Sequence, residues 1–426
     1  MTYCPLTSSI IWRNFEGLTS ILNSHLSVFF NMTHDEFPWD IGIYDAHCHP
    51  TDTMASIASI PTMQTRTLTV MATRGEDQEL VEKITQSLNN GDSSSKPREN
   101  CITPCFGWHP WFSHHIRHDT TPTAGQDLYQ LKEAHYAAVL TPTSVEDPEF
   151  VKLLPEPKPL SELIAETKER LQQFPNALVG EVGLDKAFRI PSAWTAQGLD
   201  NRDDQITLGS REGRKLSQYK VKLDHQRKIL KAQLQLAGEM GRAVSLHSVQ
   251  AHGAVFDLLK ELWTGHERVV MSRRERARHQ DAEGALSEEE EEDGQEHSSA
   301  GRPSDSNKSS QRRTRVLPFP PRVCMHSYSG PVEPIRQFLN MANPSDIYFS
   351  FSHVINFSGS SVRKVHDVIK AIPDDRILIE SDLHTAGPQM DQLLEEVARK
   401  VCEVKQWELR QGIQQLANNW KRFVFG

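Results

Sequence analysis

The 426-residue sequence is 37% hydrophobic and 24% charged, which is ordinary for a soluble globular protein. Its formal net charge of −9 argues against a general nucleic-acid coat protein, whose surface is usually basic. No apolar run approaches the roughly 20 residues that span a bilayer, so we expect no membrane segment. The six cysteines lack the paired spacing of a zinc ribbon or a disulfide scaffold, which favours reduced thiols and a cytoplasmic or nuclear protein.

Eight short, mostly apolar runs are predicted to be strands, and amphipathic helices separate most of them. The predicted strands span residues 41–44, 65–73, 101–106, 177–182, 242–246, 322–325, 347–351 and 377–379. The predicted helices span residues 76–88, 160–174, 221–240, 254–263, 332–341, 361–372, 390–404 and 408–423. This alternation is typical of an α/β protein of the (β/α)8 TIM-barrel type. A doubly wound open sheet is the second possibility, although no G-x-G-x-x-G follows a predicted strand.

Three stretches fall outside this alternation. Residues 1–39 form a predicted N-terminal extension, ahead of a barrel domain over 40–426. Residues 111–157 show no sustained period, so we expect a long insertion that is either a functional lid or disordered. Residues 272–315 combine charge blocks with almost no apolar residue, so we expect disorder there. That segment is either a solvated surface loop or an interaction segment.

Metal-capable side chains accompany five of the predicted strands. His47 and His49 follow the first strand, and residues two apart in an extended chain point to the same face, so the two rings can converge on one ion. By itself, a His-x-His is more often a pair of solvated loop histidines. The carboxyl ends of barrel strands surround one mouth, so the whole set predicts metal binding. The remaining members accompany the fourth, fifth, sixth and eighth strands and are Glu181, His247, His326 and Asp382.

With these residues in place, the chain resembles the TatD family of metal-dependent deoxyribonucleases, within the amidohydrolase-like barrels. The insertions make it most similar to fungal TatD-like proteins, some of which are described as binding a TPR-type subunit of the anaphase-promoting complex. Six motifs in the same order are far more specific than one. They are Asp45-Ala-His-Cys-His49, Gly107-Trp-His-Pro110, Gly180-Glu-Val-Gly-Leu-Asp185, Ser245-Leu-His-Ser248, His326-Ser-Tyr-Ser-Gly330 and Arg376-Ile-Leu-Ile-Glu-Ser-Asp382.

The resemblance implies two divalent metal ions bridged by Glu181, with Asp382 accepting the proton of the attacking water. His109 would bind substrate through a phosphate oxygen, although a structural role in its loop is nearly as plausible. Imidazole and carboxylate ligands do not decide between Mg²⁺, Mn²⁺ and Zn²⁺. One ion would be held by His47, His49, Glu181 and Asp382, and the other by Glu181, His247 and His326.

The implied function is hydrolysis of phosphodiester bonds in DNA, as a 3′–5′ exonuclease acting on single-stranded ends. One alternative is an amidohydrolase that acts on an ester or amide, although many such barrels carry a carbamylated lysine where this chain has Glu181. Another is a non-catalytic partner of the anaphase-promoting complex that docks through its insertions. His384 stands where bacterial members usually have proline, and is either a spectator or an added phosphate contact.

Overall fold

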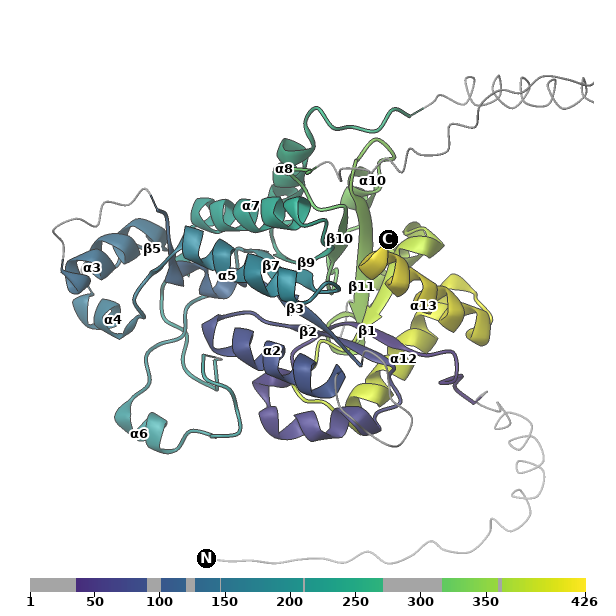
Figure 1. The fold of residues 1–426 in the computed structure, drawn as a ribbon, viewed down its shortest axis with the longest axis horizontal. Coiled ribbons are helices and arrows are strands. Elements are labelled where there is room, and N and C mark those ends of the chain that lie inside the picture. Colours follow the sequence, from purple (N-terminus) through teal and green to yellow (C-terminus); the bar gives the residue numbers. More distant parts are fainter. Residues whose placement is uncertain are drawn as a thin grey trace, which may run out of the picture. The chain divides into compact units, whose positions relative to one another are not determined.

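Eight parallel strands form one sheet in which the spatial order of the strands follows the chain (Figure 1). The N–H of Asp382 donates to the carbonyl of His47 (3.0 Å), and the N–H of His49 donates to the carbonyl of Leu383 (2.8 Å), so the last strand meets the first. The sheet is therefore a nearly closed barrel, and the predicted (β/α)8 TIM barrel is confirmed. The strands are β1 (Tyr44–Cys48), β2 (Thr67–Met71), β3 (Ile102–Phe106), β7 (Leu178–Asp185), β9 (Val244–Val249), β10 (Arg322–Met325), β11 (Asp346–Ser352) and β12 (Ile377–Glu380).

The computed structural model describes residues 36–89, 101–119, 127–145, 147–209, 211–270, 316–358 and 362–426. The chain divides into two compact units, Met1–Phe37 and Pro38–Gly426, and the second contains the barrel. The disorder expected over residues 272–315 and nearly all of the expected N-terminal extension lie outside the described residues. Within the described ranges, no helix combines the length and the apolar character needed to cross a membrane.

Helices lie around the strands in Figure 1. All but one of the barrel helices begin and end within two residues of the predicted ranges, and α10 is shorter than predicted. The helices are α2 (Gly75–Asn89), α5 (Leu160–Gln173), α7 (Leu223–Glu239), α8 (His252–Trp263), α10 (Glu333–Phe338), α11 (Val362–Ala371), α12 (Pro388–Lys405) and α13 (Leu409–Phe425).

The first strand begins later than predicted. Gly42 has a φ of 96°, a region that favours glycine, and its N–H donates to the carbonyl of Trp39 (3.0 Å), so a turn occupies the start of the predicted strand. As a result β1 runs from Tyr44 to Cys48, and His47 lies within the strand rather than after it. Because the backbone of His47 is part of the sheet, the alternation of side chains along a strand sets the face to which its ring points.

The segment over residues 111–157 contains regular structure, so disorder, one of the two expectations for this insertion, was wrong for its described residues. Its helices are α3 (Leu128–Val139) and α4 (Pro148–Leu153). The Asp127 side chain and Gln130 form a capping box at the start of α3, which is a sequence signal for a helix start. Buried residues of both helices pack with residues of the later segment 190–221 in a separate apolar cluster, which includes Tyr136, Val151 and Ile190. This cluster explains why the segment orders beside the barrel.

The amino-terminal end of the barrel is covered by α13. Trp420 stacks on Tyr44 of β1 with ring centroids 4.5 Å apart, and its indole N–H donates to Thr69 in β2 (3.1 Å). The side-chain amide of Asn419 donates to the carbonyl of Ile377 at the start of β12 (2.9 Å). The helix α13 therefore lies across the amino ends of the strands, and the opposite mouth, formed by their carboxyl ends, is the one where barrels of this type carry their active sites.

Buried histidines attach α3 and α7 to the loop after β3. His135 Nε2 lies 2.8 Å from the carbonyl of His114, and His225 Nε2 lies 2.9 Å from the carbonyl of Ser113. Burial lowers the pKa of His135 to about 4 and that of His225 to about 3. Both are therefore neutral in the folded protein at pH 7 and donate from Nε2.

These histidines predict acid sensitivity. A histidine whose folded pKa lies below its unfolded value near 6.5 contributes stability above that value and loses it as the pH falls. Between pH 7 and pH 5.5, each of the two histidines is expected to lower the free energy of unfolding by about 1 kcal/mol. We expect the His225→Gln variant, whose amide can still donate to Ser113, to lose about 1 kcal/mol less than wild type between these pH values. Urea unfolding at both pH values measures this, and equal losses in the two proteins would contradict the prediction.

Candidate metal centre

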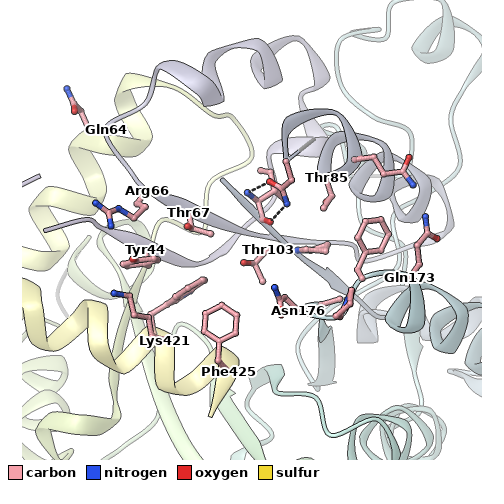
Figure 2. Close-up of a pocket in the computed structure, with 18 of the residues that line it drawn as sticks. Tyr44, Gln64, Arg66, Thr67, Thr85, Thr103, Gln173, Asn176, Lys421 and Phe425 are labelled. Carbon is pink, nitrogen blue, oxygen red and sulfur yellow. Dashed lines mark hydrogen bonds between the residues drawn. The ribbon is translucent and has the colours of Figure 1, made fainter. Parts of the chain in front are cut away.

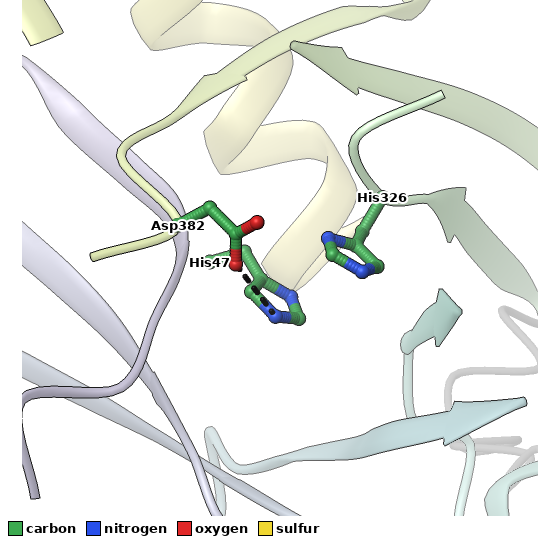
Figure 3. A group of neighbouring side chains, drawn as sticks. All are labelled: His47, His326 and Asp382. Atoms are coloured by element: carbon green, nitrogen blue, oxygen red, sulfur yellow. Dashed lines mark ion pairs between the residues drawn. The ribbon is translucent and has the colours of Figure 1, made fainter. Parts of the chain in front are cut away.

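The six predicted ligands come together at the carboxyl-end mouth of the barrel. The six side chains come from five strands, yet their ligand atoms lie close together. Figure 3 shows three of them, His47, His326 and Asp382, pointing toward a common point. His47, Glu181 and His247 lie within β1, β7 and β9, whereas His49, His326 and Asp382 follow β1, β10 and β12 as predicted. The six are His47 in β1, His49 just after it, Glu181, His247, His326 after β10 and Asp382 after β12.

The first group surrounds one oxygen of Glu181. Glu181 Oε2 lies 3.4 Å from Nε2 of both His47 and His49, and these two nitrogens are 3.1 Å apart. Asp382 Oδ1 lies 3.6 Å from His49 Nε2 and 3.9 Å from His47 Nε2. Asp382 has a φ of 54°, so its backbone adopts the left-handed conformation that brings its carboxylate to this group.

The second group surrounds the other oxygen of the same carboxylate. Glu181 Oε1 lies 2.8 Å from His247 Nδ1 and 3.0 Å from His326 Nε2. Those two nitrogens are 3.4 Å apart. The two oxygens of Glu181 therefore face two different sets of histidines, which is the arrangement of a bridging carboxylate.

These separations fit metal coordination. Two ligand atoms that each lie about 2.1 Å from one ion are about 3.0–3.4 Å apart, depending on the coordination angle. Most of the distances within the two groups lie in or close to this range. In addition, the ring nitrogens of His47 and His49 lie 3.1 Å apart in a buried site, a separation that one ion bound by both nitrogens would also give.

Three of the histidines are oriented through the ring nitrogen that points away from Glu181. Metal-binding histidines in proteins commonly use the second nitrogen in this way, which fixes the ring and its tautomer. Sequence reasoning gave none of these partners a role, because each lies far along the chain from its histidine. The pairs are His47 Nδ1 with Ser245 Oγ (2.8 Å), His247 Nε2 with Asp185 Oδ2 (3.1 Å) and His326 Nδ1 with Glu380 Oε1 (3.3 Å).

The electrostatics of the site favour an ionised Glu181. Burial would raise the pKa of Glu181, but the facing histidines His109, His326 and His47 outweigh it and hold that pKa well below the usual range. Burial would likewise lower the pKa of His49, but Asp382 and Glu181 raise it to about 9. The centre is thus a set of histidines held together by buried carboxylates, a charge pattern that suits a cation.

Asp45 links the first and last strands beneath the site. It accepts hydrogen bonds from the N–H of His47 (3.0 Å), the N–H of Ser381 (3.0 Å) and the Ser381 hydroxyl (2.6 Å). Burial raises its pKa to about 7. Asp45 belongs to the first motif, but its function is to position His47 and the segment that carries Asp382, and it does not belong to either ligand group.

His109 lies beside the second group. Its Nε2 lies 3.0 Å from Glu181 Oε1, and its Nδ1 accepts the backbone N–H of Trp111 (3.2 Å). Burial lowers the pKa of His109 to about 4, so the ring is neutral at pH 7. With Nδ1 accepting, the ring hydrogen is on Nε2. The distances would also allow His109 to ligate an ion with Glu181 and His247, but this tautomer makes it a donor instead.

Charged side chains form a rim around the mouth. Asp52 accepts from Arg74 Nη2 (2.7 Å) and pairs with His384 Nδ1 (2.7 Å). The ring of His384 stacks on that of His49 with centroids 5.3 Å apart, and the residue is 64% exposed as a side chain. His384 is therefore fixed at the mouth with much of its imidazole open to solvent, and its contact with phosphate stays a prediction.

A large cavity of about 980 Å³ lies at the other end of the barrel (Figure 2). Residues at the starts of strands line it, among them Tyr44, Thr67 and Thr103, together with Lys421 and Phe425 of α13. None of the six candidate ligands, all of which are described residues, is among them. In this fold, chemistry takes place at the carboxyl ends of the strands, so the size of this cavity does not make it the active site.

A (β/α)8 barrel with a histidine–carboxylate cluster at its mouth defines the class of amidohydrolase-like barrel hydrolases. The family model described as TatD related DNase matches residues 44–425. The chain belongs to the TatD family, as its motifs predicted.

Two curated proteins and a solved structure are among the proteins that are similar to the chain. The Cut9-interacting protein scn1 of Schizosaccharomyces pombe is 33% identical over 382 residues, which cover 90% of this chain and 98% of the relative. An uncharacterised deoxyribonuclease of Saccharomyces cerevisiae is 26% identical over 81% of this chain and 85% of its own length. The structure of an uncharacterised amidohydrolase from Saccharomyces cerevisiae matches 90% of this chain and 99% of its own, with a TM-score of 0.50 at 14% identity, which shows a shared fold.

Proposed function

We propose that this protein is a metal-dependent phosphodiesterase that cleaves DNA, using two divalent ions bridged by Glu181. The observation that carries the proposal is that the two oxygens of one buried carboxylate face two separate sets of histidines. When bound, a pair of divalent ions supplies charge stabilisation for the attacking and leaving oxygens of a phosphodiester and lowers the pKa of water. The proposed ions are Mg²⁺ or Mn²⁺, with Zn²⁺ as the alternative, since imidazole and carboxylate ligands do not decide among the three.

Asp382 is proposed to accept the proton of the attacking water. Burial would raise its pKa, but hydrogen bonding to His49 and the charges of the nearby histidines hold that pKa at about 2, so the group is ionised at neutral pH. Its side chain is 15% exposed against 5% for Glu181, so it is the carboxylate of the centre that a water can approach more easily. A carboxylate in this position can act as a general base.

Nuclease assays combined with metal analysis test this proposal. The purified protein is expected to shorten 5′-labelled single-stranded DNA stepwise from its 3′ end in Mg²⁺ or Mn²⁺, and EDTA is expected to stop the reaction. Metal content would show about two ions per chain. If the protein cleaves neither single- nor double-stranded DNA with any of the three metals but hydrolyses carboxylic esters, the proposal is wrong and the amidohydrolase alternative holds.

His109 is proposed to hold a phosphate oxygen through its Nε2 hydrogen, in place of Glu181 Oε1, which lies 3.0 Å from Nε2 in this structure. We expect His109→Ala to lower kcat/KM for DNA by about tenfold to a hundredfold, because a hydrogen bond to a charged group contributes about 1.5–3 kcal/mol. Metal content is expected to be unchanged. The His247→Ala variant serves as the comparison, and it is expected to lose metal as well as activity. Loss of an ion from His109→Ala would instead make His109 a ligand.

We further propose that the protein binds a protein partner, in addition to its chemistry. Support comes from the 33% identity to a relative that is named for its interaction with Cut9. A TPR-type subunit of the anaphase-promoting complex is the corresponding candidate here. Co-purification with that subunit is expected for the full chain, and deletion of residues 272–315 tests whether this segment is needed. Absence of binding by the full chain would contradict this role.

A further inference from the structure

An aromatic pair stands beside the second ligand group. The rings of Trp111 and Phe188 are stacked with centroids 4.5 Å apart and an interplanar angle of 9°. Trp111 is 37% exposed, although it is one of the largest apolar side chains in the protein. Its ring centroid lies 6.0 Å from that of His247, so the pair adjoins the centre directly.

The pair is held in place by the same carboxylate that orients a candidate ligand. Trp111 Nε1 donates to Asp185 Oδ2 (2.6 Å), the oxygen that also lies 3.1 Å from His247 Nε2. The other oxygen of Asp185 accepts the backbone N–H of Phe188 (2.9 Å). Because Asp185 fixes both aromatic residues and His247, the rings have a defined position relative to the metal centre.

A cavity of about 130 Å³ borders this pair. Its wall includes Trp111, Phe188 and Phe150, together with Leu153, which is 66% exposed. Arg214 supplies a cation at the wall, and no carboxylate is among the described residues that line the cavity. Aromatic surfaces and a cation suit a flat aromatic group attached to an anion, and the nearby carboxylate of Asp185 is already engaged by Trp111, Phe188 and His247.

From this arrangement we infer that the Trp111–Phe188 pair and its cavity bind an unpaired nucleobase next to the scissile phosphate. This inference rests on the proposed function, and it adds a base-binding subsite to the same site. The ring centroid of Trp111 lies 6.0 Å from that of His247, so a base stacked on the pair would lie beside the second ligand group. A base within a duplex is already stacked on its neighbours, so the site selects single-stranded DNA or frayed ends.

Replacing the base itself tests the inference. Single-stranded substrates are prepared with an abasic sugar at each of the two nucleotides that flank the cleaved bond. Stacking on aromatic side chains is sequence-tolerant and strong, so at one of these positions the wild type is expected to cleave the abasic substrate about tenfold or more slowly, as kcat/KM. A penalty below about twofold at both positions would overturn the inference.

The Phe188→Leu variant separates base binding from packing. Leucine keeps much of the apolar volume, and the backbone N–H that Asp185 accepts is unchanged. On the normal substrate, we expect kcat/KM of the variant to fall by about the same factor as removal of the base does in wild type. On the abasic substrate, we expect kcat/KM of the variant to equal that of wild type. Equal losses on both substrates would show that Phe188 only supports the site and would overturn the inference. The matched control is Phe425→Leu, a 56% exposed aromatic residue at the other end of the barrel, which should leave both rates unchanged.

Binding measurements distinguish failure of this inference from failure of the proposed function. Fluorescence anisotropy with labelled oligonucleotides in EDTA reports base discrimination without cleavage. Discriminating binding by a protein that cleaves no DNA would support the base site and reject the nuclease. Equal cleavage of normal and abasic substrates would support the nuclease and reject the base site. If wild type neither binds nor cleaves DNA, both are overturned.

Discussion

Replacement of Glu181 by glutamine is expected to abolish DNA cleavage and to release metal from both positions. Glu181 is the candidate ligand whose two carboxylate oxygens lie against different groups, at 3.4 Å on one oxygen and 2.8–3.0 Å on the other. Loss of several kcal/mol of charge stabilisation corresponds to a fall in kcat of about 10³-fold or more, at roughly tenfold per 1.4 kcal/mol. Single-turnover cleavage of labelled DNA and metal analysis of the purified variant measure the two effects.

The same substitution alters the protonation of the facing rings. Burial alone would lower the pKa of His326, and the charge of Glu181 is the largest influence that raises it. Without that charge the ring is expected to titrate at lower pH. A matched control is Glu239→Gln on α7, a half-exposed partner of Lys168 that lies outside the centre. Retention of two ions and of activity within tenfold of wild type by Glu181→Gln would contradict the bridging role.

Gly183→Ala is expected to destabilise the protein by about 4 kcal/mol or more. Gly183 in β7 is paired with His247 in β9, and a Cβ at this position would overlap the carbonyl oxygen of His247. The obstacle is backbone within the sheet, so it cannot move aside without breaking the pairing between the strands. Any shift of His247 also moves its Nδ1 from Glu181, so metal affinity should fall together with stability.

Chemical denaturation and metal titration of this variant measure the two losses. The control is Gly253→Ala in α8, where an added Cβ meets nothing within 4 Å. Alanine in a helix is up to about 1 kcal/mol more favourable than glycine, so this control should be neutral or slightly stabilising. Equal stability of the two variants would mean that β7 and β9 can separate at little cost.

Much of the barrel and the centre could be predicted from local sequence patterns. The strands are short apolar runs bounded by polar or glycine-containing segments, and that signal located all eight. The ligands were recognisable because His47, Glu181, His247 and Asp382 accompany such runs. The start of β1 was misplaced because the turn at Gly42 follows an apolar residue and carries no break in composition.

The supporting residues were not predictable in the same way. Asp185 orients His247 and Trp111, which lie 62 and 74 positions away along the chain, and such pairings leave no periodic signal. The same holds for Glu380, which lies 54 positions from His326. The helices α3 and α4 were missed because their apolar residues pack partly against the segment 190–221, whose proximity depends on the folded barrel.

The seam between β12 and β1 has a consequence for the order in which the molecule is assembled. Ser381 and Asp45 are hydrogen-bonded although 336 positions separate them, and the first ligand group draws His47 and Asp382 from the two sides of that seam. During synthesis, His47 leaves the ribosome early, whereas Asp382 leaves it only when nearly the whole chain has been made. The first ligand group can therefore form only after that. A chain stopped after β11 would carry every side chain of the second group but would lack a member of the first. An ion bound by residues on both sides of the seam would stabilise only chains in which β12 has already paired with β1, by mass action. Metal binding would therefore be a late step of folding.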